Sequence, residues 1–167
     1  FFLIKNLDNL YTYRIAFTPE TVGSIVYLSH NLEVLRKNTI AAFNLSCVGD
    51  DRAVSFLPSR IGNTLTDKLA RHVLKHLAPE HKEYNFLQDR GSDERQYCSP
   101  GVDLPMILIM RSKFRSFPEY HTSLDDLSVV SPEGLQTSFN LHKECLTLLE
   151  ANLVYRTKII GEPQLSR

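Results

Sequence analysis

The chain has 167 residues, of which 43% are hydrophobic and 23% are charged, a composition typical of one globular core. Its 19 lysines and arginines balance 19 aspartates and glutamates, and this zero net charge argues against electrostatic binding of nucleic acid. No apolar run approaches the roughly 18 residues of a membrane span. Three cysteines without paired spacing do not make a disulfide framework, so we expect a cytoplasmic, reducing setting.

The first part of the chain alternates between strand-like and helix-like patterns. Residues 11–18 are rich in β-branched and aromatic side chains and predict a strand. Apolar residues at helical spacing then predict a helix over residues 22–37. Residues 39–48 form an apolar run too short for a typical helix, which predicts a buried strand.

The same alternation continues to the end of the chain. Residues 53–57 predict a short strand, and apolar residues spaced by four predict a helix over Leu65–Leu77. Short strands are expected over residues 84–87 and 104–111. A final helix begins near Ser131, a plausible cap, and is expected to bury an apolar stripe of Leu135, Phe139, Leu146, Leu149 and Leu153.

Strands that alternate with helices predict an α/β domain with a largely parallel sheet. In such sheets, ligands bind at the carboxyl ends of the strands. Four polar clusters follow predicted strands, and we expect the functional residues among them: Pro19-Glu20, Gly49-Asp50-Asp51, Gly91-Ser92-Asp93-Glu94-Arg95 and Tyr120-His121.

Two of these clusters carry carboxylates with two possible roles. Glu20 lies between a predicted strand and a predicted helix, which suits a ligand or a general base, or a glutamate that only stabilises the helix dipole. Asp50 and Asp51 are adjacent and repel each other unless a cation lies between them. They are therefore candidates to bind a metal or Arg52, the alternative being a simple Gly-Asp turn.

The other two clusters are also ambiguous. Residues 90–98 carry both signs of charge, which predicts either an arginine site for a substrate carboxylate or an internal salt-bridge network. His121 is a candidate metal ligand oriented by Asp125 or Asp126, or else a surface histidine. Cys98 is a candidate nucleophile, but no base lies near it in the sequence.

Three segments taken together resemble one family, the aminopeptidase-like-domain proteins, a branch of the zinc aminopeptidase superfamily. The match runs across nearly the whole chain. The resemblance implies three layers, with a mixed, mostly parallel sheet flanked by helices, and bacterial members often accompany polysaccharide or secondary-metabolite biosynthesis genes. The segments are Phe17-Thr18-Pro19-Glu20-Thr21-Val22-Gly23-Ser24, Gly91-Ser92-Asp93-Glu94-Arg95-Gln96-Tyr97-Cys98-Ser99-Pro100-Gly101 and Pro118-Glu119-Tyr120-His121-Thr122-Ser123-Leu124-Asp125-Asp126-Leu127.

The resemblance implies hydrolysis of an amide bond, in a peptide or an amide-bearing small molecule, by a zinc-bound water. Glu20 matches the family's catalytic base and His121 its last histidine ligand, whereas Thr21 stands where the family has a ligand glutamate. A single zinc ion is therefore expected, unless Asp50 or Asp51 substitutes for a lost ligand. The residues expected to shape the substrate pocket are Asp93, Glu94, Arg95, Tyr97 and Tyr120, the last as an oxyanion donor.

The family's next ligand, an aspartate, aligns with Ser46 or Cys47. Loss of two metal-binding carboxylates favours the alternative, a catalytically inactive binding or scaffold module in polysaccharide or secondary-metabolite biosynthesis. We expect residues 1–160 to be the C-terminal portion of an aminopeptidase-like domain, which would leave the family's first His and bridging Asp ligands upstream of this chain. Residues 161–167 are expected to be a linker toward a missing C-terminal domain. The oligomeric state is not predicted.

Overall fold

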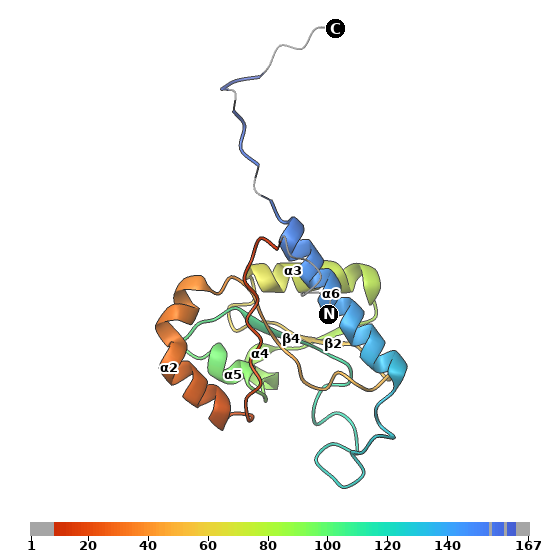
Figure 1. Ribbon diagram of the computed structural model, residues 1–167. Coiled ribbons are helices and arrows are strands. Elements are labelled where there is room, and N and C mark those ends of the chain that lie inside the picture. The colour runs from red at the N-terminus through yellow and green to blue at the C-terminus, as the bar shows by residue number, and fades with distance from the viewer. Residues whose placement is uncertain (1–8, 154, 159, 163–167) are drawn as a thin grey trace, which may run out of the picture.

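A mixed sheet organises the computed structural model, which describes residues 9–153, 155–158 and 160–162 (Figure 1). Its strands are β1 (Ala42–Asn44), β2 (Ser55–Leu57), β3 (Lys82–Glu83) and β4 (Met106–Met110), in the order β1-β4-β2-β3. β1 is parallel to β4, and β2 is parallel to β3. The central pair, β2 and β4, is antiparallel. The predicted mixed α/β sheet is confirmed.

The central strand β4 is buried on both faces, as its uninterrupted apolar sequence predicts. Side chains alternate along a strand, so Ile107 and Ile109 lie on one face of the sheet. There they pack into a core with the helices α3 (Leu65–Leu77) and α6 (Pro132–Ala151). Figure 1 shows these two helices side by side on that face of the sheet.

The opposite face carries the elements that build the site described below. Leu108 and Met110 pack there against Leu57 and Phe114. The helices on this side are α2 (Val22–Asn38), α4 (Phe86–Asp89) and α5 (Glu94–Tyr97), seen at the left and centre of Figure 1. α2 and α5 meet in a small core made of Leu28, Tyr97 and Leu104. The expected arrangement of helices on both faces of the sheet is therefore confirmed.

Polar side chains fix where the two long helices of the first face begin. Thr64 and Asp67 form a reciprocal capping box at the start of α3. Asp67 is fully buried and also accepts hydrogen bonds from the amide and the hydroxyl of Ser59. Ser131 caps α6, as predicted, because its hydroxyl accepts the amide of Gly134 at 2.9 Å.

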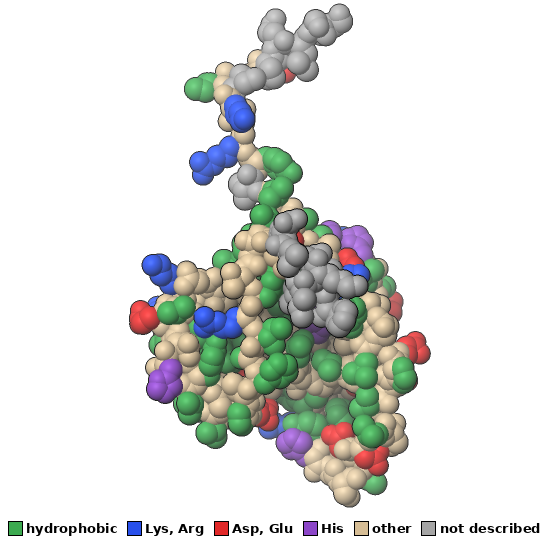
Figure 2. Space-filling model, viewed as in Figure 1, with side chains coloured by type: hydrophobic (Ala, Val, Ile, Leu, Met, Phe, Trp, Pro, Cys, Tyr) green, Lys and Arg blue, Asp and Glu red, His purple; other side chains and the backbone are tan. Residues whose placement is uncertain are grey.

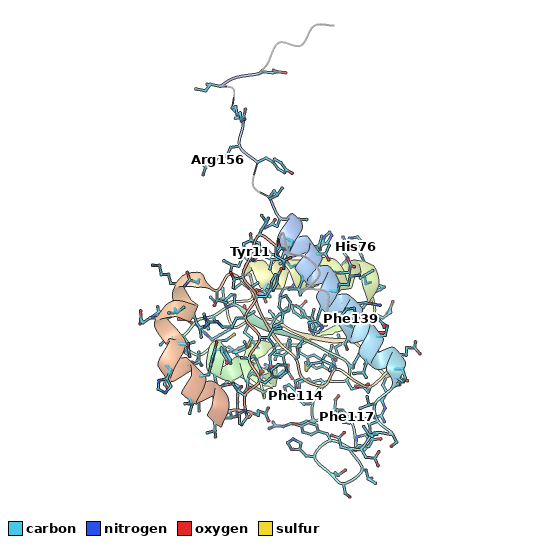
Figure 3. All side chains as sticks on the ribbon, in the orientation of Figure 1. Tyr11, His76, Phe114, Phe117, Phe139 and Arg156 are labelled. Atoms are coloured by element: carbon cyan, nitrogen blue, oxygen red, sulfur yellow. The ribbon has the colours of Figure 1, made fainter. Side chains whose placement is uncertain are left out.

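The buried face of α6 matches the predicted apolar stripe at Leu149 but not at Leu135 or Phe139. Leu135 is 47% exposed, and Phe139, labelled in Figure 3, is 52% exposed. The helix instead turns small residues inward, because its first turns approach the backbone around Gly49 too closely for large side chains. Its buried residues are Gly134, Ser138, Leu141, Cys145 and Leu149.

Two predicted strands are wrong. Residues 11–18 are not a strand, because this segment crosses α6, where Tyr13 donates its hydroxyl to Glu150 at 2.6 Å, instead of joining the sheet. Residues 84–87 are not a strand either, since the side chain of Asn85 accepts the first amides of α4 and starts a helix there. The strand that was expected here lies earlier, at β3.

Two further expectations concern the ends of the chain and the membrane. The predicted linker over residues 161–167 lies, apart from residues 161 and 162, outside the described residues. Within the described ranges, every helix is too short or too polar to span a bilayer.

Candidate active site

The chain enters α2 through a strained turn that carries Glu20. Thr21 has φ 60° and ψ −67°, and the amide of Val22 donates to the carbonyl of Glu20 at 2.7 Å, which closes a three-residue γ-turn. A positive φ is rare for a β-branched residue because its side chain crowds the backbone. Such outliers concentrate at functional sites, so this turn marks Glu20 and Thr21 as candidates.

The loop at residues 91–95 lies against this turn. Ser92 Oγ donates to Oε1 of Glu20 at 2.9 Å, and the amide of Thr21 donates to Oδ1 of Asp93 at 2.7 Å. The guanidinium of Arg95 donates to Oγ1 of Thr21 at 3.2 Å. Two of the predicted polar clusters, 72 residues apart in sequence, therefore form a single site.

A buried carboxylate holds the loop in shape. Glu94 is 0% exposed, and its Oε1 accepts the amides of Gly91 at 2.7 Å and Ser92 at 3.1 Å. Asn44, the last residue of β1, donates through Nδ2 to Ser92 Oγ at 3.2 Å and to Glu94 Oε2 at 3.4 Å. Because Asn44 ends a strand, the cluster sits at the carboxyl end of β1, where an α/β sheet is expected to bind ligands.

Cys47 and Tyr120 extend the cluster toward the segment after β4. Cys47 follows β1 with φ 49°. Burial raises the pKa of its thiol, and the charges of Asp50, Asp125 and Glu20 add to the rise. Burial also raises the pKa of Tyr120, to which Glu20 and Asp125 contribute in the same direction. Both groups therefore lie within electrostatic reach of Glu20.

His121 is exposed and belongs to the long segment between β4 and α6, part of which projects at the bottom of Figure 1. It has φ 58°, and its ring stacks on that of Tyr120 with 3.9 Å between the centroids. Tyr120 in turn meets the edge of Phe117, which is labelled in Figure 3. Figure 2 shows acidic side chains gathered on the same projecting loop. His121 is thus stacked on Tyr120, which itself packs against the core of Leu108, Met110 and Phe114.

Asp50 is a buried structural carboxylate that ties the turn after β1 to the end of β4. Its side chain accepts the amide and hydroxyl of Ser112, at 2.8 and 2.7 Å, and the amide of Arg52 at 3.0 Å. The Arg52 guanidinium pairs with Glu119 at 2.8 Å and not with either aspartate. Asp51 is exposed. The structure therefore favours the turn interpretation of this cluster, with Asp50 as its anchor.

The predicted substrate-binding residues do not all face the solvent. Glu94 and Tyr97 are buried, Tyr97 within the core under α2, so neither presents a surface to a substrate. Arg95 is exposed and Tyr120 is half-buried. Cys98 is 1% exposed and burial raises the pKa of its thiol, which argues against a nucleophilic role.

Nothing within the described ranges forms a complete metal site. No three His, Cys, Asp or Glu side chains there converge closely enough to hold an ion. His72 and His76 on α3 contact each other with 4.8 Å between ring centroids, but they form only a pair.

Sequence reasoning gave no role to Ser92 or Asn44, although both contact the acidic residues of the site. Ser92 lies in the segment 91–101 that carries the family resemblance, directly before Asp93 and Glu94. Its place next to two carboxylates could have marked it as a site residue. Asn44 was one of three polar residues, with Thr39 and Ser46, in the largely apolar run 39–48. A polar side chain in a buried strand usually has a hydrogen-bonding duty, which would have singled it out.

Known proteins are similar in sequence to this chain. The family model described as "Domain of unknown function (DUF4910)" matches residues 2–152. A curated relative from Clostridium acetobutylicum, named "Putative polysaccharide biosynthesis protein with aminopeptidase-like domain", is 38% identical over 170 residues, which cover 99% of this chain and 38% of the relative. The chain thus spans well under half the length of that relative.

Known proteins also share the fold. The crystal structure of a "putative peptidase" from Clostridium acetobutylicum is 36% identical with a TM-score of 0.87, over 98% of this chain and 38% of that one. A zinc aminopeptidase from Bacillus subtilis has a TM-score of 0.60 at 19% identity, over 78% of this chain and 33% of that one. These matches confirm the resemblance to aminopeptidase-like proteins and the fold class.

Proposed function

The chain belongs to the DUF4910 family, and on that premise we propose that it contributes to the active site of a peptidase-like hydrolase that cleaves amide bonds. The observation that carries this proposal is the carboxylate of Glu20, held by Ser92 at the carboxyl end of β1. We propose a peptide or an amide-bearing small molecule as the substrate. We also propose the cytoplasm as its compartment, because all three cysteines are free thiols.

Glu20 is assigned the general base. Amide hydrolysis requires a group that takes a proton from the attacking water and delivers it to the leaving amine. Ser92 occupies one oxygen of Glu20, and the residue is exposed, so its carboxylate can reach a water molecule. The hydroxyl of Tyr120, like that of any tyrosine with a pKa near 10 or above, is protonated at neutral pH, as an oxyanion donor must be. Arg95 is exposed beside Glu20 and suits a substrate carboxylate.

The proposal includes a single zinc ion. A catalytic zinc takes three protein ligands, and the described residues do not supply three together, so they do not fit a zinc ion by themselves. We propose His121 as one ligand of a single zinc. Asp50 is no longer assigned as a ligand, because its oxygens already accept three hydrogen bonds. Asp51 is exposed, and we keep it as a candidate zinc ligand. Other ligands would come from outside the described residues.

The second candidate function is a binding or scaffold module without catalysis, in polysaccharide or secondary-metabolite biosynthesis. It is favoured by Thr21 at a ligand position and by the name of the curated relative, which refers to polysaccharide biosynthesis.

The test measures hydrolysis of amino-acid p-nitroanilides, together with zinc content, in the full-length protein. Glu20→Gln keeps the shape of the side chain but cannot take a proton, so activity should fall by about 10²–10⁴-fold while zinc is retained. His121→Ala should lose zinc and activity together. Glu33→Gln and His30→Ala, both at exposed positions of α2, are the matched controls and should change neither quantity.

The outcomes separate the alternatives. If Glu20→Gln loses zinc as completely as His121→Ala, Glu20 is a ligand and not the base. If both variants keep metal and activity, the hydrolase proposal is wrong. A wild-type protein that hydrolyses no probe and holds less than about 0.1 equivalent of zinc after metal-replete purification would favour the scaffold function.

A further inference from the structure

The turn that carries Glu20 needs an outside partner to persist. Thr21 pairs a branched side chain with φ 60°, a conformation that a chain holds only when its surroundings impose it. Backbone hydrogen bonds from the amide of Val22 to Glu20 at 2.7 Å and from the amide of Gly23 to Pro19 at 2.9 Å close the turn from within. The amide of Thr21, however, takes its acceptor from outside the segment. Loss of that acceptor would let the strained residue relax and shift the adjacent carboxylate.

Asp93 supplies the acceptor for the backbone of Thr21, whereas Arg95 contacts the hydroxyl of that residue at 3.2 Å. Oδ1 of Asp93 accepts the amide of Thr21 at 2.7 Å, a short bond between a carboxylate and the strained residue itself. Asp93 directly follows Ser92, whose hydroxyl donates to Glu20. Two consecutive residues of one loop therefore hold the turn. Ser92 holds the side chain of Glu20, and Asp93 holds the backbone of Thr21.

The loop is rigid enough to impose this geometry. The buried carboxylate of Glu94 closes the loop on itself by accepting the amides of Gly91 and Ser92. Gly91 packs directly on Phe114, because a Cβ added there would lie 2.5 Å from Cε2 of that ring. Phe114 belongs to the core beneath the loop and is 3% exposed. The acceptor oxygen of Asp93 is thus anchored through the loop to the sheet.

We infer that Asp93 is a positioning residue for Glu20 and not a substrate-binding residue: its carboxylate holds the amide of Thr21 and so keeps the carboxylate of Glu20 against Ser92. The inference rests on the proposed function in one respect, that Glu20 is the catalytic base. The geometric part can be measured without any activity.

The first experiment measures hydrogen exchange at the amide of Thr21 by NMR. Asp93→Ala should speed exchange at this amide by at least about 10-fold, since it removes the acceptor. Asp93→Asn should stay within about threefold of wild type, because its amide oxygen can still accept. Asp126→Ala is the matched control, because Asp126 also accepts a backbone amide, that of Ser128 at 2.8 Å, in the projecting loop. It should leave Thr21 unchanged.

The second experiment compares kcat and KM for an amino-acid p-nitroanilide in the full-length protein. Asp93→Ala should lower kcat by about 10-fold or more with KM within about twofold, because a misplaced base slows chemistry and not binding. Asp93→Asn should restore kcat. If Asp93→Ala does not fold, Asp93→Ser replaces it, since the serine hydroxyl is too short to reach Thr21.

Unchanged exchange at Thr21 in Asp93→Ala would overturn the inference. So would a rise in KM with kcat retained, which is what loss of a substrate contact produces. A wild-type protein without hydrolysis would defeat the proposed function alone, and the exchange experiment would still decide whether Asp93 holds the turn.

Discussion

Gly134→Ala should destabilise this protein, although the same change in most helices has the opposite effect. Gly134 is in the first turn of α6, where alanine improves helix propensity by about 1 kcal/mol. A Cβ built on Gly134, however, falls inside van der Waals contact with the carbonyl oxygens of Gly49 and Asp50, and 2.7 Å from the carbonyl carbon of Asp50. These atoms belong to the backbone, so no rotamer change can make room.

The expected loss follows from what α6 must give up to move away. Overpacking against rigid backbone costs about 3 kcal/mol, the upper end of the usual range. The shift also weakens two hydrogen bonds, from the amide of Ser131 to Gly49 at 2.9 Å and from the hydroxyl of Ser138 to Val48 at 2.8 Å. Each is worth about 1 kcal/mol. After the propensity gain is subtracted, the free energy of unfolding should fall by about 2–4 kcal/mol.

Urea unfolding followed by circular dichroism measures this change. Thr147→Ala, at an exposed position of the same helix, is the control and should gain roughly half a kcal/mol from propensity alone. A Gly134→Ala protein as stable as wild type, or more stable, would refute the reasoning and show that α6 is not seated against the turn at Gly49.

Two further predictions concern buried titratable groups. Burial lowers the pKa of His142, whose Nε2 has no hydrogen-bond partner among the described residues, so the unfolded chain takes up a proton first as the pH falls. The free energy of unfolding should therefore decline as the pH drops below about 6.5, and His142→Leu should flatten that decline in urea titrations at pH 5 to 8. Burial raises the pKa of all three thiols, but Cys98 and Cys145 are buried whereas Cys47 is half-buried, so at pH 8 iodoacetamide should label Cys47 before either of them. Peptide mapping that finds Cys98 alkylated in the folded protein would contradict this order.

Local patterns in the sequence were sufficient for the three long helices and for the central strand, but not for the short helices α4 and α5. The predicted helices correspond to α2, α3 and α6 to within a few residues, because their apolar spacing and caps are properties of short segments. Met106–Met110 was recognisable because a strand buried on both faces needs an uninterrupted apolar run. Glu20 and Asp93 were selected as polar residues after the predicted strands 11–18 and 84–87, and neither strand is present. The site lies at the carboxyl end of a different strand, β1, which Asn44 ends.

Tertiary structure decided the features that depend on distant contacts. The antiparallel pairing of β2 with β4 leaves no local trace in either segment. The small side chains on the buried face of α6 are required by the close approach of the backbone at Gly49. No periodicity within the helix reveals that approach. The sequence indicated the candidate residues and roughly where the long helices and the central strand begin. The fold alone brought Ser92 to Glu20 and Asp93 to Thr21 across 72 residues, because hydrogen bonds between remote segments form only after the sheet and its helices have packed.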